Sequence, residues 1–125
     1  RGCKSPLFND MTIIQDKTND LIFYASSGLT NPYYLVRLVN RLTAKEFTFL
    51  DQSVVSCPFI SLELLEPGKD TPDDAINGTL KIDSGSYEIY LYDQVSNTNL
   101  DYTLSNSELY SGFAYVYNRN RRRLY

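Results

Sequence analysis

The sequence predicts an all-β fold, a single antiparallel β-sandwich with extended arms at both ends. Tyr87, Ile89 and Leu91 alternate with the residues between them, and a period of two is typical of a strand that buries one face. The 11 tyrosines and 6 phenylalanines also favour strands, because aromatic side chains pack well on a pleated surface. No segment of ten or more residues shows a helical period, so we expect no long helix.

Short segments with strand-like patterns follow one another along the chain, separated by turn residues. In chain order they are residues 11–15, 21–25, 33–39, 46–50, 59–65, 79–82, 87–92 and 113–117. Asn31-Pro32 breaks the chain before the third segment, and 42–45 favours a hairpin connection. The predicted loops are 66–77 and 93–101, while the polar residues 105–112 allow one helical turn. Seven to eight short strands at this spacing favour an immunoglobulin-like (Ig-like) sandwich over a barrel.

The alternating segments predict one apolar layer inside the domain. Its expected members are Ile60, Leu62, Leu64, Leu80, Ile82, Tyr87, Ile89 and Leu91. Phe47 and Phe49 share one face of their own segment. A chain of 125 residues is long enough to fold as one domain around such a core. We expect this domain over residues 11–117, between an N-terminal arm over 1–10 and a basic tail over 118–125.

The charge of the chain is divided unevenly between the domain and its tail. The net charge is -3, with 12 basic and 15 acidic residues. Four arginines lie close to the end of the chain: Arg119, Arg121, Arg122 and Arg123. Because the rest of the chain is strongly acidic and repels phosphate groups, we expect no specific nucleic-acid partner. No apolar run approaches the ~20 residues of a transmembrane helix, so we expect no membrane span.

The residue types do not assemble a recognisable catalytic centre. The chain has no histidine and no G-x-S-x-G segment, so an ordinary nucleophile–histidine pair is excluded. Fifteen acidic residues always permit some pair of carboxylates, and such a pair carries no specificity. We therefore expect a protein that is not an enzyme and that needs no cofactor or metal.

Two further patterns leave alternatives open. Oxygen ligands in the acidic stretch 66–74 suit calcium, but the alternating order of a calcium loop is missing, and a solvated loop is the better interpretation. Cys3 and Cys57 lack the spacing of a zinc site. A disulfide between them stays open, and two free thiols are the simpler interpretation.

The two ends of the chain and the tyrosines are the candidate binding residues. Both ends lack strand patterning and carry too little apolar surface to offset the cost of ordering them. We expect a partner to order them through Leu7, Phe8, Arg119, Arg121, Arg122, Arg123, Leu124 and Tyr125. The alternative is a sugar stacked on exposed tyrosines, with Tyr90, Tyr92, Tyr115, Tyr117 and Tyr125 as candidates. Cross-strand pairing is the simpler role for most of these tyrosines.

Three segments share their pattern with a known group of proteins. They are NPYYLVRLVN (31–40), YEIYLYDQVSNTNLD (87–101) and ELYSGFAYVY (108–117). In order and spacing they resemble small virion-associated β-sandwich proteins of phages that infect Bacteroidetes, including crAss-like and flavobacterial phages. The second segment is the most specific of the three. The chain departs from the group over 52–58, and the arm and the arginine tail are additions.

The resemblance implies a structural protein of a bacteriophage, located in the virion. Such a protein would be a capsid accessory or decoration subunit, or a head–tail connection subunit, acting through protein–protein contacts. Its partners would be capsid, portal or tail subunits in a symmetric assembly. The alternative is a carbohydrate-binding or host-adhesion module of a phage fibre or spike. The resemblance brings no catalytic or cofactor residues with it.

Overall fold

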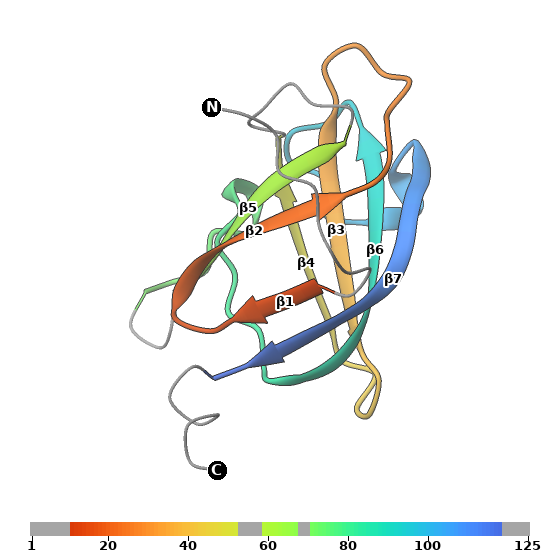
Figure 1. Cartoon of the computed structure of the whole chain (residues 1–125). Helices are drawn as coiled ribbons and strands as arrows, with labels where there is room; N and C mark the ends of the chain where they lie inside the picture. The colour runs from red at the N-terminus through yellow and green to blue at the C-terminus, as the bar shows by residue number, and fades with distance from the viewer. Residues whose placement is uncertain (1–10, 53–58, 68–70, 119–125) are drawn as a thin grey trace.

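The computed structural model describes residues 11–52, 59–67 and 71–118, which form two β-sheets (Figure 1). The strands are β1 (Met11–Ile14), β2 (Lys17–Phe23), β3 (Tyr33–Asn40), β4 (Glu46–Asp51), β5 (Ile60–Glu66), β6 (Gly85–Gln94) and β7 (Ser107–Tyr117). The larger sheet has the order β1-β7-β6-β3-β4, and the smaller sheet pairs β2 with β5. Two short 3-10 turns, η1 (Ala75–Asn77) and η2 (Tyr102–Leu104), lie in the connections. The described chain is therefore mostly β, as the sequence predicts.

The larger sheet is mixed, which corrects the expectation of a purely antiparallel fold. β1 runs parallel to β7, with Met11 opposite Ala114 and Ile14 opposite Tyr117. The other strand pairs within the described residues are antiparallel. A parallel pair needs a long connection between its strands, and here most of the domain lies between them. Sequence alternation reports which face of a strand is buried, so it gives no signal for such a distant partner.

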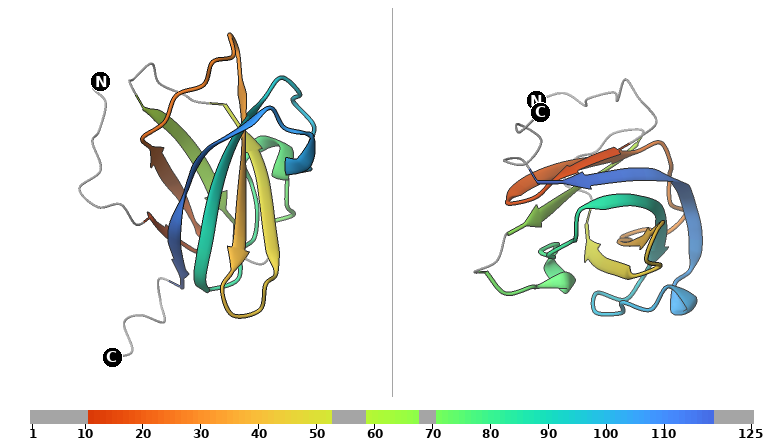
Figure 2. Two further views of the ribbon diagram at one scale, coloured as in Figure 1. Left: turned by 90° about the vertical axis from the view of Figure 1, so that its right-hand side faces the viewer. Right: turned by 90° about the horizontal axis from the view of Figure 1, so that it is seen from below.

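The core lies between the two sheets. The larger sheet is curled, and β2 and β5 pack against one of its faces (Figure 2). Fully shielded side chains come from both sides of this layer: Leu21, Phe23, Leu62 and Leu64 from the smaller sheet, and Val36, Leu38 and Ile89 from the larger one. Each strand thus contributes its alternate residues to one continuous apolar cluster.

The predicted apolar layer is confirmed. All the residues named for it are buried, and all belong to this main cluster. Phe49 is buried and Phe47 packs against the same cluster, so the two phenylalanines do share a face. The hairpin connection over 42–45 is also found, between β3 and β4. Alternation predicts this layer well because a one-residue slip would turn every apolar side chain to solvent.

A second, smaller apolar cluster lies on the opposite face of the larger sheet. Its buried members are Leu35, Leu50 and Tyr92, with Tyr33 and Tyr90 packed against them. The connection between β6 and β7 helps to cover this face, since the ring centroid of Tyr102 lies 5.4 Å from that of Tyr92. The sequence places Tyr92 on the outward face of its strand, where Leu35, Leu50 and the folded-back connection together bury it.

Two predicted segments have a different structure. Residues 79–82 do not form a strand, and Thr79 makes only isolated bridges to Leu65 and Asp74. Residues 107–112 belong to β7, and the helical turn lies earlier, at η2. β6 pairs with β7 along this polar stretch, while Ser107 and Ser111 remain exposed to solvent. Hydrogen bonding to a neighbouring strand therefore outweighed the polar composition of the segment.

Several sequence predictions fall outside the described ranges. They concern the arm 1–10 with Leu7 and Phe8, the tail anchors Arg119, Arg121, Arg122, Arg123, Leu124 and Tyr125, both cysteines, and Asp70. The predicted partner-binding role of the two ends and the alternatives for Cys3 and Cys57 therefore stay predictions.

Two buried polar side chains hold the connections between the sheets. Glu66, at the end of β5, accepts hydrogen bonds from the backbone N–H groups of Asp16 (2.7 Å) and Ile82 (3.1 Å). Asp16 has a φ of 61°, so this bond holds a left-handed residue in the turn from β1 to β2. The Tyr87 hydroxyl donates to the carbonyl of Asp83 at 2.6 Å, at the point where the chain enters β6. These bonds fix where the chain passes from one sheet to the other.

We expect Ile89→Ala to lower the free energy of unfolding by about 2–5 kcal/mol, because it opens a cavity in the fully shielded core. Glu88→Ala, on the other face of the same strand, should lower it by less than about 1 kcal/mol. Urea denaturation of both variants measures the difference. Equal losses would show that the register assigned to β6 is inverted.

Candidate interaction surface

Aromatic and charged side chains stand in register on the outer face of the larger sheet, the face turned away from β2 and β5. Across β3, β6 and β7 the successive rows are Arg37, Tyr90 and Ser111, then Val39, Glu88 and Phe113, then Arg41, Ser86 and Tyr115. Phe113 is 43% exposed and Tyr115 is 38% exposed. Tyrosine, phenylalanine and arginine are enriched in protein interfaces, so this face has the composition of a contact surface.

Arg37 is the central residue of this face. Its guanidinium makes two hydrogen bonds with the Glu46 carboxylate on β4, at 2.9 and 3.2 Å. It also lies 4.1 Å from the ring centroid of Tyr102 and 5.1 Å from that of Tyr90. The hydrogen bonds between the two side chains raise the pKa of Arg37 and lower that of Glu46, so both stay charged. Because Tyr102 belongs to the connection between β6 and β7, Arg37 fastens that connection onto the sheet.

Polar side chains order the connection between β6 and β7. Gln94 is buried at the end of β6 and donates through Nε2 to the carbonyls of Ser96 (2.9 Å) and Asn99 (3.0 Å). Asn99 donates back through Nδ2 to Gln94 Oε1 at 2.9 Å. The Asp101 carboxylate caps the start of η2, because it accepts hydrogen bonds from the backbone N–H and the hydroxyl of Thr103. The polar loop that the sequence predicts is thus a structured element.

This structured connection presents apolar side chains to solvent. Val95 is 77% exposed and Leu104 is 72% exposed. Leu100 and Tyr102, in the same connection, are each 38% exposed. A single exposed apolar residue is ordinary, but several on one ordered connection make it a candidate contact surface.

Asp93 joins two connections at this end of the domain. Its buried carboxylate accepts hydrogen bonds from the Ser27 hydroxyl (2.5 Å), the Asn106 amide (3.1 Å), and both the backbone N–H and the hydroxyl of Ser107 (3.0 Å each). Burial raises the pKa of Asp93, but these hydrogen bonds outweigh burial and hold the pKa below its usual value. Ser27 follows β2, whereas Asn106 and Ser107 lie at the start of β7. One carboxylate therefore links segments that are distant in the sequence.

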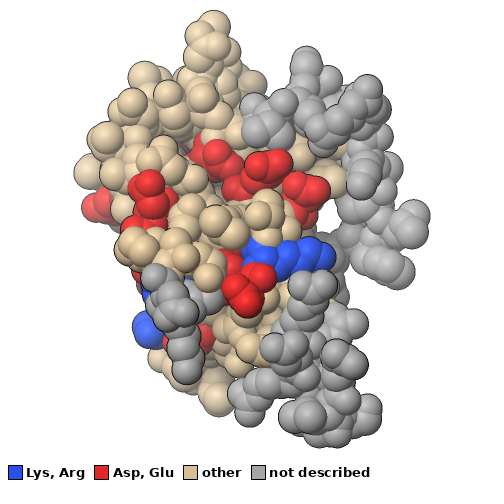
Figure 3. All heavy atoms as spheres, turned by 90° about the vertical axis from the view of Figure 1, so that its left-hand side faces the viewer, with Lys and Arg blue, Asp and Glu red and all other residues tan. Residues whose placement is uncertain are grey.

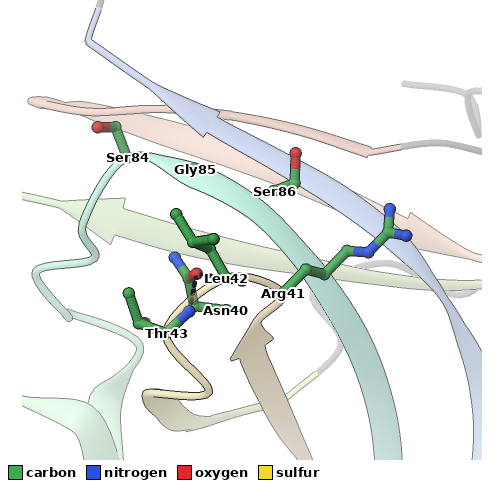
Figure 4. A pocket seen from close by; sticks show the side chains of 7 residues that line it. All are labelled: Asn40, Arg41, Leu42, Thr43, Ser84, Gly85 and Ser86. Carbon is green, nitrogen blue, oxygen red and sulfur yellow. Dashed lines mark hydrogen bonds between the residues drawn. The ribbon is translucent and has the colours of Figure 1, made fainter.

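A pocket of about 460 Å³ lies at the other end of the larger sheet (Figure 4). It is lined by Asn40, Arg41, Leu42, Thr43, Ser84, Gly85 and Ser86. Asn40 Oδ1 accepts the backbone N–H groups of Leu42 (2.9 Å) and Thr43 (3.0 Å), which closes the turn from β3 to β4. The Arg41 side chain reaches toward β7, where its guanidinium lies 4.8 Å from the ring centroid of Phe113. Asn40 thus stabilises the turn and Arg41 packs on the outer face, so neither side chain is directed at a ligand in the pocket.

Acidic side chains gather on the side of the molecule that carries β5 and the connection after it (Figure 3). Asp73 pairs with Lys81 at 3.2 Å, and Asp74 accepts the Asn77 amide at 3.0 Å. Glu66 instead binds backbone groups inside the domain. Within the described ranges, no three carboxylate, thiol or imidazole groups lie close enough together to hold a metal ion. These acids therefore have structural partners.

The structure separates the tyrosines that the sequence groups as candidates for sugar stacking. Tyr92 is buried, Tyr90 and Tyr117 are partly buried, and Tyr115 is exposed. Tyr125 lies beyond the described residues.

The sequence did not predict the role of Arg37. A charged residue between Val36 and Leu38 in a strand was an available signal, because it indicates a position on the outer face.

Comparison of the chain with protein-family models, with curated proteins and with solved structures found no match. In the described part of the chain, no helix has the length and apolar character needed to cross a membrane.

Asp93→Asn should lower the free energy of unfolding at neutral pH by about 1–3 kcal/mol, because an amide is a weaker acceptor and brings donors of its own. The folded-state pKa of Asp93 lies below the value of about 3.9 expected for an unfolded chain. Its stabilisation is therefore present above pH ~4 and is lost as the pH falls through the folded-state pKa.

Between pH ~5 and ~2 the unsubstituted protein should accordingly lose more stability than the Asp93→Asn variant. Urea unfolding at a series of pH values measures both slopes. Parallel slopes would contradict the role assigned to the carboxylate.

Proposed function

We propose that the protein is a structural subunit that acts through protein–protein contacts, with the connection between β6 and β7 as its main contact element. The observation that carries this proposal is that the connection is ordered and yet exposes apolar side chains to solvent. Gln94, Asn99 and Arg37 hold it in place, while Val95 and Leu104 remain exposed. A loop already held in one conformation binds without the cost of ordering it.

The two most exposed side chains of this connection supply a driving force for docking. Fully burying a valine or leucine contributes about 1.5–3 kcal/mol relative to leaving it in water. A partner that covers both Val95 and Leu104 would gain several times the thermal energy before the cost of association is subtracted. A small contact of this kind suits a subunit whose binding is repeated many times in a symmetric assembly.

We propose a bacteriophage particle as the setting, with the chain as a capsid accessory or decoration subunit or a head–tail connection subunit. This part rests on the resemblance of segments 31–40, 87–101 and 108–117 to small phage proteins. In the fold these segments supply most of β3, β6 and β7, which are adjacent in one sheet, together with the first part of the contact element. Capsid, portal or tail subunits are the expected partners, and the anchors predicted in the arm and tail would add to the same docking.

We also propose that the two sheets form an Ig-like sandwich. Two observations support this. The order β7-β6-β3-β4 opposite β2-β5 corresponds to strands G-F-C-C′ opposite B-E in variable-type domains. The Tyr87 hydroxyl on the Asp83 carbonyl corresponds to the tyrosine corner at the start of strand F. Ile89 then stands where disulfide-bonded domains of this type have a cysteine.

Tyr87→Phe should lower the free energy of unfolding by about 1–2 kcal/mol, because it removes the hydroxyl that donates a 2.6 Å hydrogen bond to the Asp83 carbonyl. Thermal or urea unfolding of the variant measures the loss. Tyr90→Phe, whose hydroxyl lies on the outer face, is the matched control and should lose less. An unchanged stability for Tyr87→Phe would remove the tyrosine corner from the argument for an Ig-like fold.

The contact element is tested by a double variant, Val95→Asp with Leu104→Asp. Both side chains are exposed, so the melting temperature should stay within about 2 °C of the original. Incorporation into phage particles should fall at least about tenfold, because two charges would be buried against the partner. Quantitative mass spectrometry of purified particles measures incorporation.

Leu42→Asp is the matched control for this experiment, since Leu42 is 93% exposed and lies in the turn from β3 to β4. It should be incorporated normally. Normal incorporation of the double variant, or an equal defect in the control, would show that the connection is not the contact element. Absence of the unsubstituted chain from purified particles would instead refute the virion setting.

A further inference from the structure

A shallow depression of about 220 Å³ lies on the outer face of the larger sheet, between β6 and β7. It is lined by Glu88, Tyr90, Ser111, Gly112 and Phe113. Sites for drug-sized ligands usually measure about 300–1,000 Å³, so this depression has room for a single small ring. Val95 and Leu104, the exposed residues of the contact element, are not part of its lining.

Two polar groups in the depression can form further hydrogen bonds with a ligand. The Tyr90 hydroxyl donates to Glu88 Oε1 at 2.8 Å, and this bond holds the carboxylate in place. The same hydrogen bond raises the pKa of Tyr90, so its hydroxyl keeps its proton. Among the described residues, nothing donates to Glu88 Oε2, and the exposed Ser111 hydroxyl has no hydrogen-bond partner either. The depression thus offers a positioned carboxylate acceptor beside a hydroxyl that both donates and accepts.

Phe113 forms the apolar wall of the depression. Its side chain is 43% exposed and lies opposite Glu88 in the register of β6 and β7. Tyr90 and Ser111 occupy the neighbouring row on one side of Phe113. Arg41 belongs to the row on the other side, and its guanidinium lies 4.8 Å from the ring centroid of Phe113. Arg41 itself does not line the depression.

We propose that this depression binds one neutral pyranose ring of a glycan. A pyranose combines a face of C–H groups with a rim of hydroxyl groups. The C–H face packs against the Phe113 ring, because the electron-rich face of an aromatic ring attracts weakly positive hydrogens. The rim donates to Glu88 Oε2 and exchanges hydrogen bonds with Ser111. A purely apolar ligand would desolvate the carboxylate without giving it a donor, which costs binding energy.

The carboxylate selects against acidic sugars. No basic residue belongs to the described lining of the depression. Arg37 and Arg41 contact the rings of Tyr90 and Phe113 from outside this lining, and the charge of Arg37 is paired with Glu46. A uronic or sialic acid would place a second negative charge beside Glu88, and like charges at short range repel. Neutral hexoses and N-acetylhexosamines are therefore the expected ligand class.

The test is an NMR titration of the full chain with methyl glycosides of glucose, galactose, mannose and N-acetylglucosamine, and with methyl glucuronide as the acidic counterpart. A single ring with few contacts should bind with a dissociation constant of about 1–10 mM. The expected chemical-shift changes centre on Glu88, Ser111 and Gly112. The glucuronide should bind at least about fivefold more weakly than the glucoside.

Variants separate a binding site from a merely aromatic surface. Phe113→Ala should abolish binding, and Glu88→Gln should weaken binding of the neutral glycosides about tenfold. Glu88→Gln should also remove the discrimination against the glucuronide, which a change in folding alone would not do. Tyr115→Ala is the control, because Tyr115 is similarly exposed on the same strand but does not line the depression.

Three outcomes would overturn the inference. They are no shift with any neutral glycoside at about 50 mM, undiminished binding by the Phe113→Ala variant, and an equal loss with Tyr115→Ala. Melting temperatures of the variants identify any that unfold. The inference does not rest on the phage setting or on the contact element, since it uses different residues and a purified chain, so the failure of one proposal leaves the other standing.

Discussion

The alternation of β6 is the constraint on which the rest of the domain depends. This strand lies between β7 and β3 in the larger sheet, and Tyr87, Ile89 and Leu91 on its inner face are fully shielded in the core. Because side chains alternate between the two faces, the core also sets which residues of β6 face outward. Glu88 and Tyr90 therefore stand on the outer face, where they line the depression proposed to bind a sugar. The burial of one face thus positions the chemistry of the other.

Two buried polar residues at the end of β6 order the connections around it. Asp93 and Gln94 are buried polar residues, and a buried polar group is costly unless it is hydrogen-bonded. Their partners lie in the connections around them, from Ser27 after β2 to Asn106 before β7. In the described residues, no buried side-chain nitrogen or oxygen lacks a hydrogen-bond partner. Satisfying these two side chains orders the connection that presents Val95 and Leu104 to solvent.

Two surfaces with different chemistry share this framework. The contact element exposes apolar side chains and lies beyond the ends of the strands, whereas the depression is small, partly polar and lies on the sheet itself. Arg37 connects them physically, since its guanidinium contacts both Tyr102 in the connection and Tyr90 at the depression. Substitutions at Arg37 would disturb both surfaces, so the two proposed roles are best separated with substitutions that leave Arg37 intact.

The sequence by itself determined most strand positions and the buried layer from Ile60 to Leu91, because alternation and turn residues are local properties of the chain. Its errors, at 79–82 and 107–112, arose where a neighbouring strand decides the structure: 79–82 finds only isolated bridges, and 107–112 finds β6. Only the tertiary structure decided the parallel pairing of β1 with β7, the packing of the Tyr102 ring against Tyr92, and the partners of Arg37. The candidate surface was out of reach for the same reason. Its residues come from β3, β4, β6 and β7, and a single sequence carries no signal for contacts between segments so far apart.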